Sequence, residues 1–203
     1  MARSRNTRRP NLKILILCEG KTERNYLLEI KHQLPREKQH GIKIDVDHFK
    51  RNDPLNLVIE AARRKRKAKH EGAPYDHIWV VFDHDNLPNR DKAFFKAESN
   101  SIKIAYSSFN IEFWFLLHFQ YSTRQFTNGD DVKEYLRQNF ISNYEPGKTR
   151  LLPILDDLFN TASNNADMLR RDKQRDINAG IQIWNLNPYV TIDELVKFIH
   201  NLR

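Results

Sequence analysis

The chain has 203 residues, a formal net charge of +8 at neutral pH and a single cysteine. One cysteine excludes an intrachain disulfide and a zinc site made of several thiolates. No apolar stretch has the length of a membrane span, and the arginine-rich amino terminus lacks the apolar run of a secretory signal. We therefore expect a cytoplasmic protein that does not bind membranes. The excess of positive charge favours an anionic partner, and nucleic acid is the partner we expect.

Apolar runs of strand length alternate with stretches of helical periodicity over the first 121 residues. Strands are predicted at 12–18, 42–46, 78–82 and 102–106. Helices are predicted from a cap at Thr22 to about Leu34, at 55–69 after Asp53-Pro54, at 92–98, and at 111–119 after a cap at Asn110. This alternation is typical of a Rossmann-like α/β fold, in which helices flank a mostly parallel sheet.

The pattern changes after Tyr121, where helical stretches are separated by polar loops. Two or three helices are expected there, with breaks at Pro146-Gly147 and Asn164-Asn165. Residues 191–194 have the form of a capping box, with Thr191 as the cap, and predict a last amphipathic helix that closes the fold. We therefore predict a flexible basic arm at 1–10, an α/β core at 11–121, and a helical carboxyl-terminal extension at 122–203 that packs on the core.

Acidic residues follow two of the predicted strands. Glu19 and Glu23 come after the first strand, and Asp83 and Asp85 come after the third. If these strands are neighbours in a parallel sheet, both clusters lie at one edge, where open α/β sheets collect their ligands. Carboxylate oxygens suit hard cations, so the sequence predicts a site for Mg²⁺ or Mn²⁺. The alternative is that these acidic residues only end their strands in solvent.

A dense run of positive charge is predicted near the end of the second helix. It consists of Arg63, Arg64, Lys65, Arg66 and Lys67, followed by Lys69. So many like charges repel one another unless an anion or an acidic partner lies near, and the run therefore predicts binding to nucleic acid phosphates. No base-reading motif accompanies it, so the expected contact is with the nucleic acid backbone. A solvated helix face is the alternative explanation.

Two other motifs offer alternatives to the metal site. Gly20-Lys21-Thr22 is similar to the end of a phosphate-binding P-loop, but Leu15 stands where that motif requires its first glycine. A strand that ends in Asp-x-Asp also occurs in the haloacid-dehalogenase phosphatases, whose first aspartate is a nucleophile. Those proteins have Thr or Val where this chain has Leu87, and their chemistry gives Glu19 and Glu23 no role. The phosphatase reading stays as a second hypothesis.

The acidic motifs carry a family resemblance. A glutamate after the first strand and an Asp-x-Asp after a later strand resemble the Toprim fold, which primases, topoisomerases and several nucleases share. Four blocks of the chain resemble, in order, those of the RloB-like proteins, also called AbiLii-like. These blocks are 17–23, 83–86, 107–119 and 184–188. The resemblance extends roughly from Leu12 to the carboxyl end and implies a Toprim-like core.

The resemblance also implies roles for individual carboxylates. Glu19 matches the Toprim glutamate, which is a metal ligand or a general acid and base, and Asp83 and Asp85 match the metal-binding pair. The overcoming-lysogeny-defect nucleases, which look like relatives, use extra carboxylates to hold a second metal. Glu23 and Glu112 are the residues that would supply them here. Glu112 also has a purely structural explanation, because a carboxylate near a helix amino terminus is favoured by the helix dipole.

Nuclease sites of this kind often contain a lysine that neutralises the phosphate. Lys21, beside Glu19, and Lys148, in the loop after Pro146-Gly147, are the lysines that we expect to take this role. Either of them is equally explained as an ordinary surface lysine.

The function implied by the resemblance is that of a Mg²⁺- or Mn²⁺-dependent nuclease. In this family it would act as the toxic effector of a prokaryotic abortive-infection system, beside an ATPase partner. The sequence leaves open whether the substrate is RNA, including transfer RNA, or DNA, and it leaves the oligomeric state open. Two alternatives remain. One is a Toprim ribonuclease of the ribosomal-RNA-maturation type, and the other is a binding module whose acidic site is structural.

Overall fold

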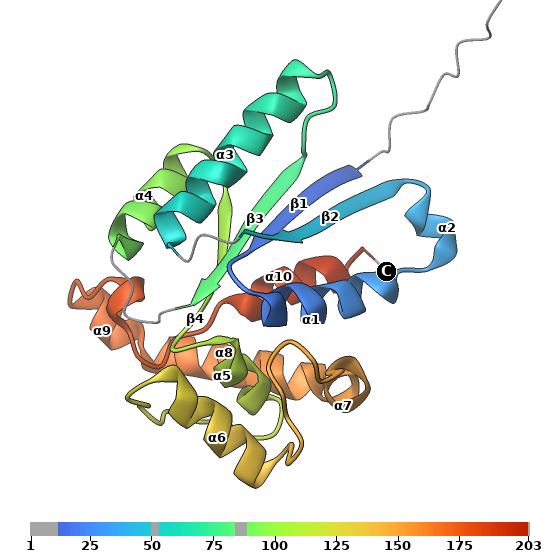
Figure 1. Cartoon of the computed structure of the whole chain (residues 1–203). Coiled ribbons are helices and arrows are strands. Elements are labelled where there is room, and N and C mark those ends of the chain that lie inside the picture. The colour runs from blue at the N-terminus through green and yellow to red at the C-terminus, as the bar shows by residue number, and fades with distance from the viewer. Residues whose placement is uncertain (1–11, 50–52, 84–88, 203) are drawn as a thin grey trace, which may run out of the picture.

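The structure is a computed structural model of the chain, and it describes residues 12–49, 53–83 and 89–202. The predicted basic arm at 1–10 and the proposed ligand Asp85 lie outside these residues. Figure 1 shows a sheet with helices on both faces and a group of further helices beside one end of the strands.

The sheet contains four strands that all run parallel. They are β1 (Leu12–Cys18), β2 (Ile42–His48), β3 (His77–Asp83) and β4 (Lys103–Ser107), in the order β2-β1-β3-β4. The two inner strands are almost fully buried, as expected for parallel strands covered on both faces. The predicted α/β fold with a mostly parallel sheet is therefore confirmed.

The register of the two inner strands sets the geometry of the carboxyl edge. Cys18, the last residue of β1, pairs with Val81, so β3 continues for two residues beyond the end of β1. The N–H of Glu19 donates to the carbonyl of Val81 at 2.9 Å. As a result, Glu19 and Asp83 leave the sheet beside each other.

Each face of the sheet is covered by two helices (Figure 1). On one face, α3 (Pro54–His70) and α4 (Arg90–Ser99) pack against Leu15, Leu17 and Phe82. The other face carries α1 (Lys21–His32) and α10 (Ile192–His200), which pack against Ile14, Ile16 and Val81. The short helix α2 (Arg36–Gln39) connects α1 to β2. The last helix of the chain therefore completes the layer that α1 begins.

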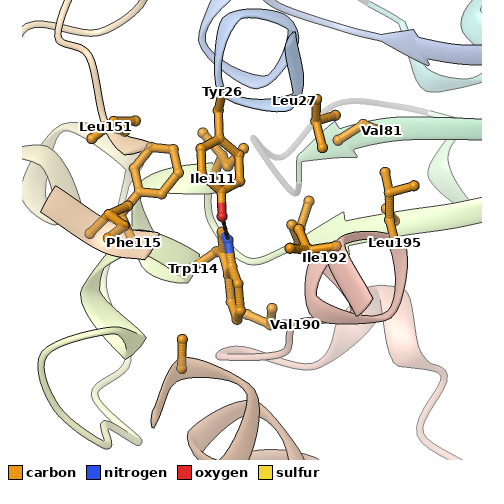
Figure 2. Close-up of a cluster of buried hydrophobic side chains, with 14 of the residues drawn as sticks. Tyr26, Leu27, Val81, Ile111, Trp114, Phe115, Leu151, Val190, Ile192 and Leu195 are labelled. Atoms are coloured by element: carbon orange, nitrogen blue, oxygen red, sulfur yellow. Dashed lines mark hydrogen bonds between the residues drawn. The ribbon is translucent and has the colours of Figure 1, made fainter. Parts of the chain in front are cut away.

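The extension contains more helical pieces than the two or three expected. They are α6 (Gly129–Asn139), α7 (Leu152–Leu155), α8 (Phe159–Asp172) and α9 (Gln174–Asn178), with single 3-10 turns at Asp156–Leu158 and Ile183–Asn185. Helices α6 and α8 pack against α5 (Ile111–Leu117), all of whose residues are buried. Trp114 of α5 donates from Nε1 to the hydroxyl of Tyr26 at 3.0 Å, in the core where α1, α5 and α10 meet (Figure 2).

The helix caps expected from the sequence are only partly found in the fold. Asp53 caps α3 as predicted, and its side chain accepts from two backbone N–H groups. Thr22 does not cap α1, which begins one residue earlier, after Gly20. Asn110 does occupy the N-cap position of α5, but its side-chain amide donates to Gly129 instead of capping the helix. Of these three expected caps, the side chain of Asp53 caps its helix, and those of Thr22 and Asn110 do not.

Two further signals were overridden by contacts between distant segments. The Thr191 hydroxyl accepts a hydrogen bond from the backbone N–H of Tyr106 at 3.0 Å and makes no cap bond to α10. Asn164-Asn165 lies inside α8 and is not a break, because the Asn165 amide donates to the Leu117 carbonyl at 2.8 Å. Both contacts fasten the extension to the core.

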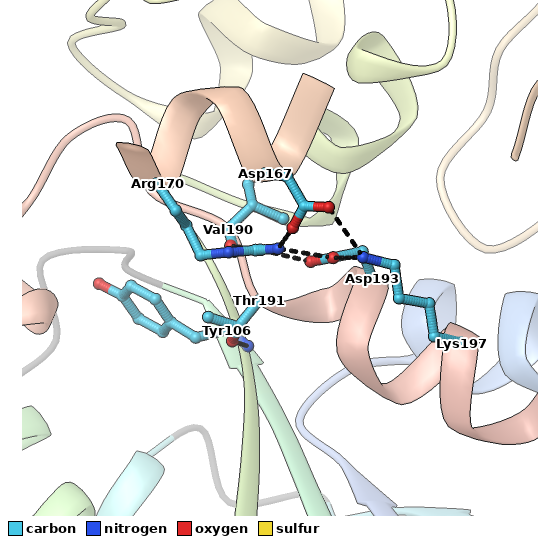
Figure 3. A network of polar contacts seen from close by, with 7 residues as sticks. All are labelled: Tyr106, Asp167, Arg170, Val190, Thr191, Asp193 and Lys197. Atoms are coloured by element: carbon cyan, nitrogen blue, oxygen red, sulfur yellow. Dashed lines mark hydrogen bonds and ion pairs between the residues drawn. The ribbon is translucent and has the colours of Figure 1, made fainter. Parts of the chain in front are cut away.

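A buried ion-pair network joins α8 to α10 (Figure 3). Arg170 of α8 forms a two-pronged contact with Asp193, at 2.6 Å and 2.8 Å, and donates to the carbonyl of Val190. Asp193 is fully buried and also accepts from Lys197 at 3.0 Å, while Asp167 contacts both cations. Such a paired charge stabilises one packing of the two helices, because separation would leave Asp193 buried and unpaired.

None of the helices in the part of the chain that the structure describes combines the length and apolar character needed to cross a membrane.

Candidate metal site at the carboxyl edge of the sheet

Glu19 and Asp83 lie next to each other at the carboxyl ends of β1 and β3. The backbone N–H of Asp83 donates to Glu19 Oε2 at 3.3 Å. Asp83 is the last residue of β3 and is 7% exposed, so its side chain lies mostly beneath the surface. The two residues that the sequence places at separate strand ends are therefore brought together.

Glu23 adds a third carboxylate from the first turn of α1. Its side chain is buried, and its Oε2 has no hydrogen-bond partner among the described residues. A Cβ on Gly20 would lie 2.6 Å from this oxygen, so the glycine leaves the space that the carboxylate fills. A buried carboxylate oxygen without a donor is costly in the absence of a cation or a proton.

The pKa of Glu23 reflects these surroundings. Burial raises the pKa to about 7, and the negative charge of Glu112 acts in the same direction. Hydrogen bonds from the backbone N–H groups of Gly20 and Glu23 and an interaction with Asp83 oppose the increase. A cation bound between the carboxylates would favour the ionised form of Glu23.

Glu112 occupies the first turn of α5 and is 2% exposed. Its Oε1 accepts a hydrogen bond of 2.6 Å from the hydroxyl of Tyr144, which is also buried. Burial and the charge of Glu112 raise the pKa of the Tyr144 phenol, so this group remains a donor at neutral pH. Tyr144 is absent from the residues that the sequence predicts, because it lies 32 positions from Glu112 in a segment without periodicity.

The carboxylates at this edge are of the kind that binds a hard cation. Glu19, Glu23, Asp83 and Glu112 offer only oxygen atoms, which suits Mg²⁺ or Mn²⁺. The buried Glu23 Oε2, which has no hydrogen-bond partner among the described residues, would gain a partner from such a cation. Among the described residues, no three His, Cys, Asp or Glu side chains form a ready-made metal cluster. Asp85 lies outside the described residues, and its role as a ligand stays a prediction.

The two candidate phosphate lysines lie near the start of α1. Lys21 is its first residue and is exposed. The loop that contains Lys148 packs here, because a Cβ on Gly147 would lie 3.6 Å from the Cβ of Lys21, and Asn25 donates to the Gly147 carbonyl at 2.8 Å. Lys148 itself is exposed and pairs with Glu145 at 2.7 Å. The structure thus brings both lysines to the same helix end.

The basic run lies elsewhere on the molecule. Helix α3 connects two parallel strands, so it starts at the carboxyl edge of the sheet and ends at the opposite edge (Figure 1). The run occupies its second half, away from the carboxylates. Four of its residues have partners in the fold. Arg63 pairs with Glu60, Arg64 with Glu60 and Asp47, Lys67 with Glu71, and Lys65 donates to the carbonyl of Asn100.

The remaining cations of the run are Arg66 and Lys69, both exposed. Neither takes part in an ion pair among the described residues. Acidic neighbours in the fold therefore neutralise part of the charge of the run. Binding of phosphate by the run stays a prediction.

The geometry can be compared with known proteins. The family model described as RloB-like protein matches residues 14–199. No curated protein and no solved structure matches the chain. The matched region includes Glu19, Glu23, Asp83, Glu112 and Tyr144, so every described residue of the acidic edge falls within it. Because the match covers almost the whole sequence, the chain belongs to the RloB-like family.

Proposed function

We propose that this protein is a divalent-metal-dependent nuclease that hydrolyses phosphodiester bonds of RNA or DNA. The observation that carries the proposal is the convergence of Glu19, Asp83 and Glu23 at one edge of a parallel sheet. These residues come from two strand ends and a helix start, and the mutual repulsion of their charges opposes their close approach. Catalytic sites commonly contain groups whose pKa is shifted by burial and by neighbouring charges, as the pKa of Glu23 is here.

The chemistry follows from the charge that phosphodiester hydrolysis creates. A bound Mg²⁺ or Mn²⁺ would activate water and stabilise negative charge on the phosphate oxygens. Glu19, Glu23, Asp83 and Asp85 would hold the metal, and Glu112 would support them or accept a proton from the attacking water. Lys21 and Lys148 would bind the phosphate from the start of α1, and Lys148 would first leave Glu145.

Family membership supports a biological role for such an activity. We propose that the protein is a cytoplasmic effector in prokaryotic antiviral defence, with an ATPase partner that controls it. The net charge of +8 agrees with a nucleic acid substrate, but does not separate RNA from DNA. A substrate panel that includes transfer RNA, single-stranded DNA and plasmid separates these classes.

The test compares the wild type with Asp83→Asn and with Asp130→Asn, each in Mn²⁺, Mg²⁺ or chelator. Asp130 is a matched control because it is exposed and, among the described residues, forms its ion pair with Lys133, away from the carboxyl edge of the sheet. Cutting that needs metal and is lost in Asp83→Asn alone would support the proposal. Equal cutting by all three proteins, or cutting in chelator, would contradict a metal nuclease at this edge.

A second candidate is a binding module with a structural acidic site. It is favoured by the hydrogen bonds that already satisfy parts of Glu23 and Glu112, from backbone N–H groups and from Tyr144. A binding module would retain nucleic acid in a shift assay with each metal and would leave every substrate intact, also in the presence of the ATPase partner. If Asp83→Asn also binds nucleic acid with the affinity of the wild type, the binding-module hypothesis is supported.

A further inference from the structure

Tyr144 is anchored between the extension and the start of α1. It lies in the segment between α6 and α7, and its carbonyl accepts a hydrogen bond from Arg137 at 2.9 Å. The residues that follow are fastened along α1, where Asn25 donates to Gly147 and Glu29 accepts from the N–H of Leu152, each at 2.8 Å. The backbone around Tyr144 is therefore held from two sides.

The phenol of Tyr144 is fixed as well as its backbone. Its ring contacts Phe115 edge to face, with the ring centroids 6.2 Å apart. Its hydroxyl meets Glu112 Oε1 at 2.6 Å, and the two side chains are 1% and 2% exposed. A short bond from a neutral donor to a carboxylate is strong where water is excluded.

The hydrogen bond from Tyr144 restrains the Glu112 carboxylate, which repulsion from a neighbouring carboxylate would otherwise displace. Asp83 at the end of β3 pairs with Ser107 at the end of β4, and α5 begins just after β4, so Glu112 in its first turn lies at the same edge of the sheet as Glu23. Both carboxylates are buried, and their like charges repel each other. This repulsion favours a rotation of the Glu112 side chain away from Glu23. The Tyr144 hydroxyl opposes that rotation because it holds one oxygen of the Glu112 carboxylate in place.

We infer that Tyr144 is a positioning residue of the metal site, which holds Glu112 toward Glu23 and Asp83 by its 2.6 Å hydrogen bond. The inference rests on the proposed function. It makes the carboxyl-terminal extension part of the site, since Tyr144 belongs to the extension and Glu112 to the core. Groups that orient metal-binding side chains commonly change metal affinity by about 10- to 100-fold when they are removed.

The test measures Mn²⁺ affinity by calorimetry on the full chain, without substrate. Tyr144→Phe removes only the hydroxyl and is expected to weaken binding by about 10- to 100-fold. Tyr135→Phe is the matched control, because the Tyr135 hydroxyl also joins the extension to the core, accepting from Gln120 at 3.0 Å, but makes no hydrogen bond to a carboxylate of the described residues. Its Mn²⁺ affinity is expected to equal that of the wild type. Thermal unfolding of both variants shows whether each is folded.

A double-mutant cycle with Glu112→Gln separates positioning from a general loss of packing. If Tyr144 acts through Glu112, Tyr144→Phe has no further effect on Mn²⁺ affinity in the Glu112→Gln background. An unchanged affinity in Tyr144→Phe, or the same loss in both backgrounds, would overturn the inference while the metal site stood. A wild type that does not bind Mn²⁺ would overturn the proposed function and the inference with it.

Discussion

The backbone N–H of Asp83 donates to the side chain of Glu19 over 3.3 Å, across the ends of two adjacent strands. The contact follows from the register of the sheet, because β3 extends two residues beyond the last pair that it forms with β1. The sheet thus places one acidic side chain over the backbone of another. A pair of acidic residues fixed in this way needs no loop to bring it together.

The first prediction concerns stabilisation of the fold by metal. Mn²⁺ at about 100 times its dissociation constant should stabilise the wild type by about 2.7 kcal/mol. Asp83→Asn should remove most of this gain and should also be more stable than the wild type in chelator, because one of the mutually repelling charges is gone. Thermal or urea unfolding with Mn²⁺ and with chelator measures both effects. Equal gains in Asp83→Asn and the wild type would argue against Asp83 as a ligand.

The second prediction concerns the space beside Glu23. Gly20→Ala would place a methyl group 2.6 Å from Glu23 Oε2, so the carboxylate must move. The backbone at Gly20 is extended, with φ −119°, and accommodates alanine without strain. We expect Mn²⁺ affinity to fall at least about tenfold, with a loss of stability of about 1–3 kcal/mol from crowding. Calorimetry and urea unfolding measure the two effects, and an unchanged affinity would show that Glu23 is not a ligand.

The fold was predictable from the sequence where the signal is local or follows from parallel topology. The buried strands appear as continuous apolar runs, and the sequence alternates them with helices. Two carboxylates at strand ends then meet whenever their strands are neighbours, as Glu19 and Asp83 do. No knowledge of side-chain packing was needed for this part of the site.

The remaining features depend on contacts that the sequence does not encode locally. Tyr144 reaches Glu112 across 32 residues, and nothing in its neighbourhood marks it as different from other core tyrosines. Thr191 resembles a helix cap, but its hydroxyl is taken by the N–H of Tyr106. Asn165 resembles a helix breaker, but its amide bonds the Leu117 carbonyl and is accommodated within α8. In each case a tertiary hydrogen bond outweighs a local preference.

The third prediction concerns the joint between α8 and α10. Arg170→Met leaves Asp193 buried beside Lys197 without its two-pronged partner, and should destabilise the protein by about 3–5 kcal/mol. Lys67→Met removes an exposed pair with Glu71 and should cost less than about 1 kcal/mol. Urea unfolding compares the two variants. Similar losses in both would mean that the buried network does not hold the two helices together.

The fourth prediction concerns the basic run on α3. Arg66 and Lys69 are its exposed members without an ion pair among the described residues, so they are the ones available to phosphates. Reversing both to Glu should weaken binding to single-stranded nucleic acid. The slope of log affinity against log salt should fall by about 0.7 for each lost contact. Arg36→Glu with Lys38→Glu, on exposed positions of α2, makes the same change in net charge and serves as the control. Equal slopes of log affinity against log salt in the two double variants would mean that the basic run is a solvated helix face and does not bind phosphate.

The last prediction concerns the pH dependence of stability. His118 is buried at the end of α5, and burial lowers its pKa from 6.5 to about 4. Between these values the unfolded chain binds a proton that the folded protein does not, so His118 opposes folding increasingly as the pH falls from 6.5 to 4. The full effect is about 3 kcal/mol, and the stability is regained above pH 6.5.

His118→Gln cannot titrate and should therefore show a flatter decline in unfolding free energy between pH 7 and pH 4. The variant should be less stable than the wild type at pH 7, where the hydrogen bond between the ring and the Trp114 carbonyl is lost, and should approach it at pH 4. His40→Gln is the control and should follow the wild-type curve, because His40 lies exposed on the surface. Parallel curves for all three proteins would mean that His118 takes up its proton in the folded state as readily as in the unfolded chain.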